Sequence, residues 1–264
     1  RLRVDAVANF VNSNSDNVPT SGDGPASYMY NFIWQERNAD LDWFRNYWVP
    51  GLEGIQQRNN LTFSDNVYFM ANETLSPFEK NRIFGNVRAS LDITDNLILQ
   101  LRSGIDTYSE VRKTRKAFSA LRRPQGMYRF QEISFLESNT DMLLRYDKPI
   151  NENLSFNVSL GGNLMHQQNR IATATNVALA IPEVYNIGNT GAPTQLEELD
   201  AQKAIYSVYG LTQLSFKNFL FLDVTARNDW SSTLPTNNNS YFYPSLGLSG
   251  VVSEVIDLDP AISQ

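Results

Sequence analysis

The chain has 264 residues and a net charge of −6, from 22 lysines and arginines against 28 aspartates and glutamates. This acidic balance argues against a general nucleic-acid binder, which needs a basic surface to neutralise phosphates. There is no cysteine and only one histidine, His166, which excludes disulfides, thiol nucleophiles, cysteine-ligated metals and histidine-rich metal sites. No apolar run reaches the roughly 18 residues of a transmembrane helix. With 15 Phe, 12 Tyr and 4 Trp the chain is too aromatic to be disordered, and β-structure is the first expectation.

Apolar and polar residues alternate along several segments, which is the pattern of a β-strand with one apolar side. The first segment lies at the start of the sequence, where Leu2 and Val4 alternate with Arg3 and Asp5. The same period predicts strands over residues 86–93, 97–104, 154–164, 206–216 and 220–227. The apolar side includes the sets Leu154, Phe156, Val158 and Leu160, and Leu220, Leu222 and Val224.

Short and long connections alternate between these strands. Tight polar turns are predicted at 94–96, 148–153 and 217–218, and long loops at 12–82, 110–137, 166–202 and 231–239. Outer-membrane barrels have this arrangement, with strands of about 10 residues, short periplasmic turns and long external loops. Only helices and closed barrels satisfy every backbone group inside hydrocarbon. The sequence therefore predicts an all-β fold, a segment of an antiparallel transmembrane β-barrel.

Two other architectures fit the alternation. A soluble β-sandwich that binds or hydrolyses carbohydrate also has one packed face and one wet face. A complete eight-stranded barrel with a structural or adhesive role would have a filled interior and no channel. The direction in which the apolar side points distinguishes the sandwich from the barrels, and the curvature of the sheet distinguishes a wide barrel from a small closed one.

In a barrel, the polar side of each strand faces the lumen, where it hydrogen-bonds hydrated solutes or another part of the protein. Contact with a passing substrate and ion pairing with a plug domain are both open roles for these side chains. No catalytic constellation accompanies them, because His166 has no nucleophile motif of the G-x-S-x-G type beside it, and we expect neither an enzyme nor a bound cofactor or metal. The lumen-facing polar residues are Arg88, Asp92, Gln100, Arg102, Asn157, Asn163, Gln213, Asp223 and Arg227.

The segment that begins at Leu220 is more specific than any periodicity. It contains the run Arg227-Asn228-Asp229-Trp230-Ser231-Ser232, followed by Thr233-Leu234-Pro235 and, after an asparagine-rich link, by Ser240-Tyr241-Phe242-Tyr243-Pro244-Ser245. These residues closely resemble the characteristic barrel segment of SusC-like (RagA-type) TonB-dependent outer-membrane transporters. Weaker similarity to the same family extends over residues 86–108, 154–164, 181–186 and 205–222.

The resemblance implies that residues 1–264 are part of the barrel domain of such a transporter, about eight of its roughly 22 strands. It implies active import of oligosaccharides or peptides across the outer membrane of a Gram-negative bacterium, with membrane lipid around the barrel. Members of the family work with a SusD-like surface lipoprotein that acts as a lid, and TonB energises them through a plug region. We find no plug motif, TonB box or terminal strand in these residues, so we expect the middle of a longer chain.

The predicted loop at 12–82 holds four aromatic residues: Trp34, Trp43, Tyr47 and Trp48. The resemblance implies that external loops contact the lid and help to line the substrate cavity. Tryptophan and tyrosine suit both tasks, because they offer a large rigid surface with a polar edge. They suit equally a small core within the loop itself. In the motif after Leu220, we favour a structural role, with Trp230 at the membrane interface and Asp229 and Ser231 satisfying turn amides.

Overall fold

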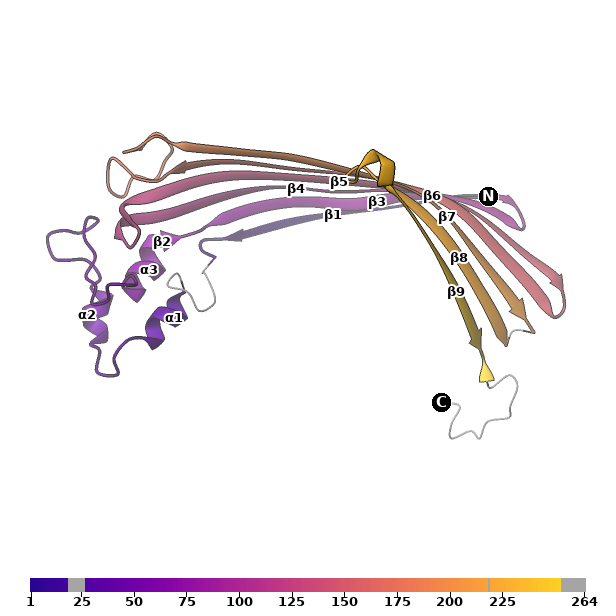
Figure 1. Cartoon of the computed structure of the whole chain (residues 1–264), viewed down its shortest axis with the longest axis horizontal. Coiled ribbons are helices and arrows are strands. Elements are labelled where there is room, and N and C mark those ends of the chain that lie inside the picture. Colours follow the sequence, from indigo (N-terminus) through magenta and orange to yellow (C-terminus); the bar gives the residue numbers. More distant parts are fainter. Residues whose placement is uncertain (19–26, 218, 253–264) are drawn as a thin grey trace.

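A computed structural model of the chain describes residues 1–18, 27–217 and 219–252. They form one antiparallel sheet of nine strands with a small helical unit at one end (Figure 1). The predicted turn residue Asn218 lies outside the described residues. The strands are β1 Leu2–Ser15, β2 Thr74–Leu75, β3 Phe78–Thr94, β4 Leu97–Ala120, β5 Arg123–Asn151, β6 Leu154–Asn176, β7 Gln195–Phe216, β8 Leu220–Ser231 and β9 Ser240–Gly250. The helices are α1 Tyr28–Ile33, α2 Leu41–Arg45, α3 Val67–Glu73 and the 3-10 turn η1 Thr236–Asn238.

The sheet is a single open layer. Its eight long strands pair in chain order from β1 to β9, and the short strand β2 pairs with β4 beside this path. Strands β1 and β9 form the two edges and do not pair with each other, and no second sheet exists among the described residues. The β-sandwich and the small closed barrel are therefore both wrong, and a segment of a wide antiparallel barrel wall is confirmed.

The pairing register decides which side chains share a face, because directly opposed residues of antiparallel strands point to the same side. One row crosses the sheet through Arg102, Asp141, Asn163, Ser207 and Asp229. We call the side that carries this row the inner face and the opposite side the outer face. The apolar sets predicted from the sequence on β6 and β8 all lie on the outer face.

The two faces differ in exposure. Leu160 and Val208 on the outer face are 60% and 59% exposed, whereas Asn163 and Ser207 on the inner face are 8% and 3% exposed. No second sheet covers either face, so this difference reflects the curvature of the sheet seen in Figure 1. Side chains crowd one another on a concave face and spread apart on a convex one. The apolar outer face is therefore the convex side, as a barrel in lipid requires.

The apolar band on the outer face has the height of a bilayer core. On β6 it extends from Leu154 to Leu164, which is roughly 33 Å of strand, or about 25 Å for a strand tilted by about 40°. Aromatic residues mark both edges of the band. Phe216 and Phe219 are in edge contact at 5.9 Å beside the tight turn, and Trp230 pairs with Tyr206 at the other edge. These positions match the aromatic girdles of outer-membrane barrels.

Two of the predicted long loops are mostly strand. Strands β4 and β5 continue to a tight turn at residues 121–122, and β6 and β7 extend to a loop at residues 177–194. Beyond His166 the outer face becomes polar: Gln168 and Arg170 follow, and Arg170 forms a 3.3 Å ion pair with Asp200 of β7. The predicted boundaries at 110, 137, 166 and 202 therefore lie within paired strands and not at strand ends. At His166 the boundary marks where the outer face becomes polar.

The stretch predicted as one loop over 12–82 contains three helices, which with their connections form what we call the cap (residues 27–75). Each helix starts at a side chain that accepts hydrogen bonds from the first free backbone N–H groups. Ser27 starts α1, Asp40 starts α2 and Asn66 starts α3. Among the described residues no helix is long and apolar enough to cross a membrane. In Figure 1 the cap lies below the left end of the sheet.

The cap has a core of its own, which is anchored to the end of the β4–β5 hairpin. Phe69 of α3 is fully buried and packs with Ala117 and Ala120 of β4. The Asp65 carboxylate accepts hydrogen bonds of 2.6 Å from the Leu121 backbone N–H and from the Gln57 side chain. These contacts hold the cap in one position relative to the strands.

A charge placed in the middle of the outer face tests the orientation of the sheet. We expect Leu160→Arg to lower the free energy of unfolding in lipid by about 2–4 kcal/mol, because it exposes a guanidinium to hydrocarbon. Leu211→Arg is the matched control, since Leu211 lies at a similar depth on the inner face and is 40% exposed. Urea unfolding of the complete protein in liposomes measures both, and an equal loss in the two variants would contradict the assignment of the faces.

Candidate functional site: the inner face

The register places all nine polar residues that were assigned to the lumen on the inner face. Arg88 opposes Arg102, and the row of Arg102 contains Asn163. Arg227 opposes Tyr209 on the same face, two residues along the strands from this row. Asn157, Gln213 and Asp223 form a second row nearer the tight turns. Asp92 on β3 and Gln100 on β4 lie an even number of residues from Arg88 and Arg102, respectively, so they point to the same face. Contact of these nine residues with a substrate remains a prediction.

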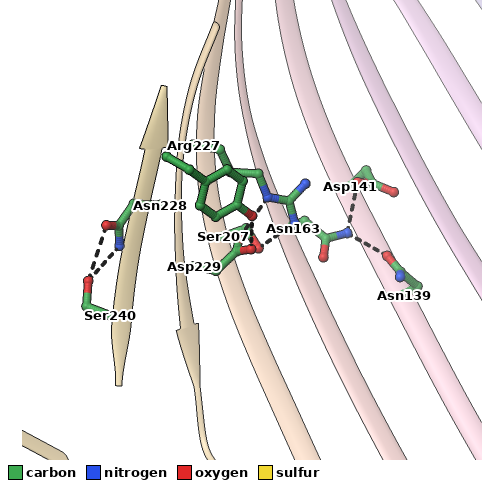
Figure 2. A network of polar contacts seen from close by, with 9 residues as sticks. Asn139, Asp141, Asn163, Ser207, Arg227, Asn228, Asp229 and Ser240 are labelled. Carbon is green, nitrogen blue, oxygen red and sulfur yellow. Dashed lines mark hydrogen bonds and ion pairs between the residues drawn. The ribbon is translucent and has the colours of Figure 1, made fainter. Parts of the chain in front are cut away.

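One polar cluster joins β4, β5 and β6. Arg102 donates a 2.8 Å hydrogen bond to the Asp141 carboxylate, forming an ion pair. The Asn163 amide donates to the other oxygen of Asp141 at 2.8 Å and to the Asn139 side-chain oxygen at 2.5 Å. Figure 2 shows Asn163 between Asp141 and Asn139. Asp141 is therefore neutralised by one cation and oriented by one amide.

A second cluster joins β7, β8 and β9 (Figure 2). The Arg227 guanidinium donates to Asp229 at 2.8 Å and to the Ser207 hydroxyl at 2.9 Å. The Tyr243 hydroxyl donates to the second oxygen of Asp229. The same guanidinium lies 5.6 Å from the ring centre of Tyr209. Arg227, predicted from the sequence as a lumen residue, thus links β8 to β7, and its partner Asp229 extends the cluster to β9.

Nearer the tight turns the inner face is held by amide–carboxylate pairs. The Gln213 side chain donates to Asp223 at 2.7 Å across β7 and β8. The Asn157 side chain donates to Asp147 of β5. The Asp147 carboxylate also forms a 2.7 Å ion pair with Arg145 of its own strand. These contacts satisfy the carboxylates and keep this part of the wall polar.

Three of the predicted lumen residues differ in how they are paired. Asp92 forms a 3.4 Å ion pair with Arg3 of β1. Arg88 is exposed and has no side-chain hydrogen bond or ion pair among the described residues, although Asp5 of β1 lies opposite it. Gln100 likewise has no side-chain partner in the described part of the chain. Arg88 therefore leaves a cationic group available on the inner face.

Strand β5 carries inner-face residues that were not predicted from the sequence. This strand contributes Glu137, Asn139 and Asp141 to the inner face, while Met142 and Leu144 point outward. The alternation of Asp141 with its two apolar neighbours carries the same signal as the predicted strands. This signal is weak in the sequence because Ser138, Asn139 and Thr140, which follow the predicted loop, are polar on both faces of the strand.

Opposite charges on the inner face are placed to compensate one another. Arg82 donates two hydrogen bonds to Asp106 on β4, one of them at 2.8 Å, in a bidentate ion pair. Among the residues that the structure describes, no group of three or more histidines, aspartates and glutamates is placed to hold a metal ion. The charged side chains of this wall contact one another through hydrogen bonds and ion pairs.

The motif after Leu220 joins strands through its side chains. On the outer face, the Asn228 amide donates to the Ser240 hydroxyl at 2.9 Å, and that hydroxyl donates back at 3.2 Å (Figure 2). The Ser232 hydroxyl accepts a 2.9 Å hydrogen bond from the Ala204 backbone N–H of β7. With Arg227 and Asp229 on the inner face, the motif binds β8 to both of its neighbours, which supports a structural role.

The four aromatic residues predicted for the long loop fall into two groups. Tyr47 and Trp48 pack against Phe69 in the core of the cap, with ring centres 6.2 Å and 5.3 Å from it. Trp43 is half-buried, and Trp34 at the end of α1 is 58% exposed. Trp34 therefore has most of its ring available to a partner, whereas Tyr47 and Trp48 stabilise the cap.

Two tyrosines lie where the cap meets the loop at residues 177–194. Burial, and after it the 3.0 Å hydrogen bond to Glu73, raises the pKa of Tyr47 to about 12. Burial also raises the pKa of Tyr185 to about 12, and the nearby Arg115 guanidinium opposes this shift. Both phenols stay protonated at neutral pH. The Tyr47 hydroxyl donates to Glu73, whereas the buried Tyr185 hydroxyl has no hydrogen-bond partner among the described residues.

A glycine on the inner face accommodates an aromatic ring. Gly161 is paired with Tyr209, and a Cβ atom at Gly161 would lie only 2.4 Å from the Tyr209 ring. A ring laid over a strand glycine replaces the packing that the glycine lacks. The neighbouring Gly162 points outward, and a Cβ atom there would meet only the Ser207 carbonyl oxygen at 3.5 Å.

The fold is similar to that of solved outer-membrane importers. The RagAB peptide importer in its closed-closed state matches with a TM-score of 0.74 and 17% identity, over 96% of this chain and 28% of that chain. The open-open state gives a TM-score of 0.73 and 18% identity over 94% and 27%. No protein-family model and no curated protein matches the sequence. The chain thus spans about a quarter of the length of these structures, and it has the fold of a segment of their barrel wall.

The glycine under Tyr209 gives a test of inner-face packing. We expect Gly161→Ala to lower the free energy of unfolding by about 1–3 kcal/mol, because the methyl group displaces the ring. Gly162→Ala is the matched control and should be neutral or stabilising by up to about 1 kcal/mol. Denaturant unfolding of the complete protein measures both variants. Equal stabilities for the two alanine variants would show that the ring does not pack on Gly161.

Proposed function

We propose that residues 1–264 are part of the barrel domain of a TonB-dependent importer of the SusC/RagA type in the outer membrane of a Gram-negative bacterium. The observation that carries this proposal is the contrast between the faces of one open curved sheet. The outer face bears an apolar band of bilayer height, and the inner face bears paired charges and amides. The family resemblance of the motif at residues 227–232 supports the same function.

The substrates of this importer are oligosaccharides or peptides. The polar inner wall supports the passage of hydrated solutes, because amide and hydroxyl groups replace the hydrogen bonds of water. The neighbour RagAB is described as a peptide importer, which favours peptides. TonB would act through a plug region outside these residues, and the chemistry of the substrate would not change during import.

A SusD-like lipoprotein on the cell surface is the partner that we propose for the cap. The loop end of the sheet, where the cap lies, would face the outside of the cell. Helix α1 exposes Met29, Ile33 and Trp34 at 71%, 72% and 58%. Such a group of apolar side chains above the membrane is typical of a protein interface, and tryptophan is a frequent anchor in one. These exposures support contact between the lid and α1.

Energised uptake tests the proposal as a whole. Cells that produce the complete protein should accumulate a labelled oligopeptide or oligosaccharide mixture in the periplasm, and cells that lack it should not. Because TonB draws on the protonmotive force, an uncoupler should reduce uptake to the level of the deletion strain. Uptake that persists in uncoupled cells would mean passive diffusion, and recovery of the protein in the soluble fraction would exclude the membrane location.

Truncation of Trp34 tests the partner. We expect Trp34→Ala to weaken binding of the lipoprotein lid about tenfold or more, as loss of a buried tryptophan anchor costs about 2 kcal/mol. Ile55→Ala is the control, since Ile55 is 51% exposed in the cap but lies outside α1. Co-purification of the lid with each variant is the measurement. Wild-type recovery of the lid with Trp34→Ala would remove α1 from the interface.

A further inference from the structure

The inner face has a hollow of about 360 Å³ centred on Gly104 of β4. Gly104 is opposed by Asn86 on β3 and Asn139 on β5, so the missing side chain leaves a depression between two amides. Phe84 and Glu137 border the hollow on the side toward the loop end. A volume of this size lies within the range of small-molecule sites.

The hollow contains one uncompensated charge. Its two other charged residues are already paired: Asp106 with Arg82, and Arg102 with Asp141. Glu137 has no hydrogen bond or ion pair among the described residues, and it is half-buried opposite Asp106. A half-buried carboxylate without a partner attracts a cation, and the adjacent carboxylate strengthens this attraction. The hollow therefore favours a ligand with a positive group.

The floor of the hollow offers groups that recognise an amide. Asn86 has no side-chain hydrogen bond in the described part of the chain, and Asn139 uses only its oxygen, which accepts from Asn163. The Asn86 amide can therefore both donate and accept, and the Asn139 NH2 group can donate, so together they offer the complement of a peptide group. These two asparagines flank the glycine, where a backbone can approach the sheet closely.

Arg88 lies on β3 just outside the hollow, on the side away from Glu137, and it lies opposite Arg102, which lines the hollow. The two residues are four positions apart along the strands and two strands apart across the sheet, which corresponds to about 17 Å. An extended peptide of about five residues has this length. Arg88 is exposed and has no partner among the described residues, so it can meet a carboxylate. The two free charges thus match the termini of a short peptide in sign and separation.

Other substrate classes fit this hollow less well. A sugar ring needs a free aromatic face, but the Arg82 guanidinium covers Phe84 at 4.9 Å from its ring centre. An anionic ligand such as a ferric siderophore would meet Glu137 and Asp106 first. Neither class uses the combination of one free carboxylate, two amides and one free guanidinium.

We infer that the Gly104 hollow is a binding site for short peptides of about five residues with free termini, with the amino end at Glu137 and the carboxyl end at Arg88. This inference rests on the proposed import function and specifies its substrate class. The peptide lies across β3, β4 and β5, and its backbone bonds to Asn86 and Asn139 over the glycine.

Calorimetric binding to the complete purified protein tests the site. The probes are a pentapeptide of alanine and glycine with free termini, the same peptide with an acetylated amino end, and maltopentaose. We expect Glu137→Gln to weaken the free pentapeptide about tenfold and to leave the acetylated peptide unchanged, because only the free amine makes a charge-assisted hydrogen bond. Arg88→Gln should weaken both peptides, and Gly104→Leu should abolish binding of both by filling the hollow.

Glu132→Gln is the matched control, because Glu132 lies on the outer face of the same strand and is exposed. Equal weakening in both glutamate variants, or none in Glu137→Gln, would overturn the site. Binding of maltopentaose but of neither peptide would overturn the substrate class. A lower thermal stability of Glu137→Gln with unchanged peptide binding would show that another part of the protein fills the hollow. Each of these results leaves energised uptake intact, so failure of the site is distinguishable from failure of the import proposal.

Discussion

The structure depends on one constraint: within hydrocarbon, every backbone N–H and C=O group must pair inside the protein. The eight long strands meet this constraint by pairing with both neighbours in chain order, except at the edges β1 and β9. The period of two follows from the same geometry, since each strand then divides its side chains between lipid and lumen. The apolar outer face and the polar inner face are thus two results of a single pairing pattern.

The same constraint explains why the inner face is so extensively paired. A charged residue beside a low-dielectric wall is costly unless an opposite charge or a hydrogen bond satisfies it. Two ion pairs satisfy this requirement: Arg102 with Asp141 across two neighbouring strands, and Arg227 with Asp229 along one strand. Residues without partners are therefore the informative ones. Among the described residues, Arg88 and Glu137 are unpaired in a wall where most charges are compensated. Glu137 borders the hollow, and Arg88 lies next to it, opposite Arg102.

The strands and faces could be predicted from the sequence because period two is a local signal. The placement of the nine polar residues on one face follows from it, since a strand offers only two sides and the apolar side was clear. Strand ends could not be predicted, because His166 and Gln168 lose the apolar alternation while their backbone pairing continues. The cap was missed as well. Its helices are five to seven residues long, too short for a helical period, and they depend on contacts with β4.

The site itself shows where sequence reasoning ends. The hollow exists because Gly104 lies between Asn86 and Asn139, which are 18 and 35 positions away along the chain. The alternation of side chains along each strand could place each of these residues on the inner face, but only the register of paired strands brings them into one row. A register is a property of paired strands, set by turns and bulges such as the irregularity between Asp92 and Thr94. One residue of slip in β3 would carry Asn86 to the outer face and leave Val87 beside the glycine, so the tight turns at the opposite end of the sheet determine which groups a substrate meets.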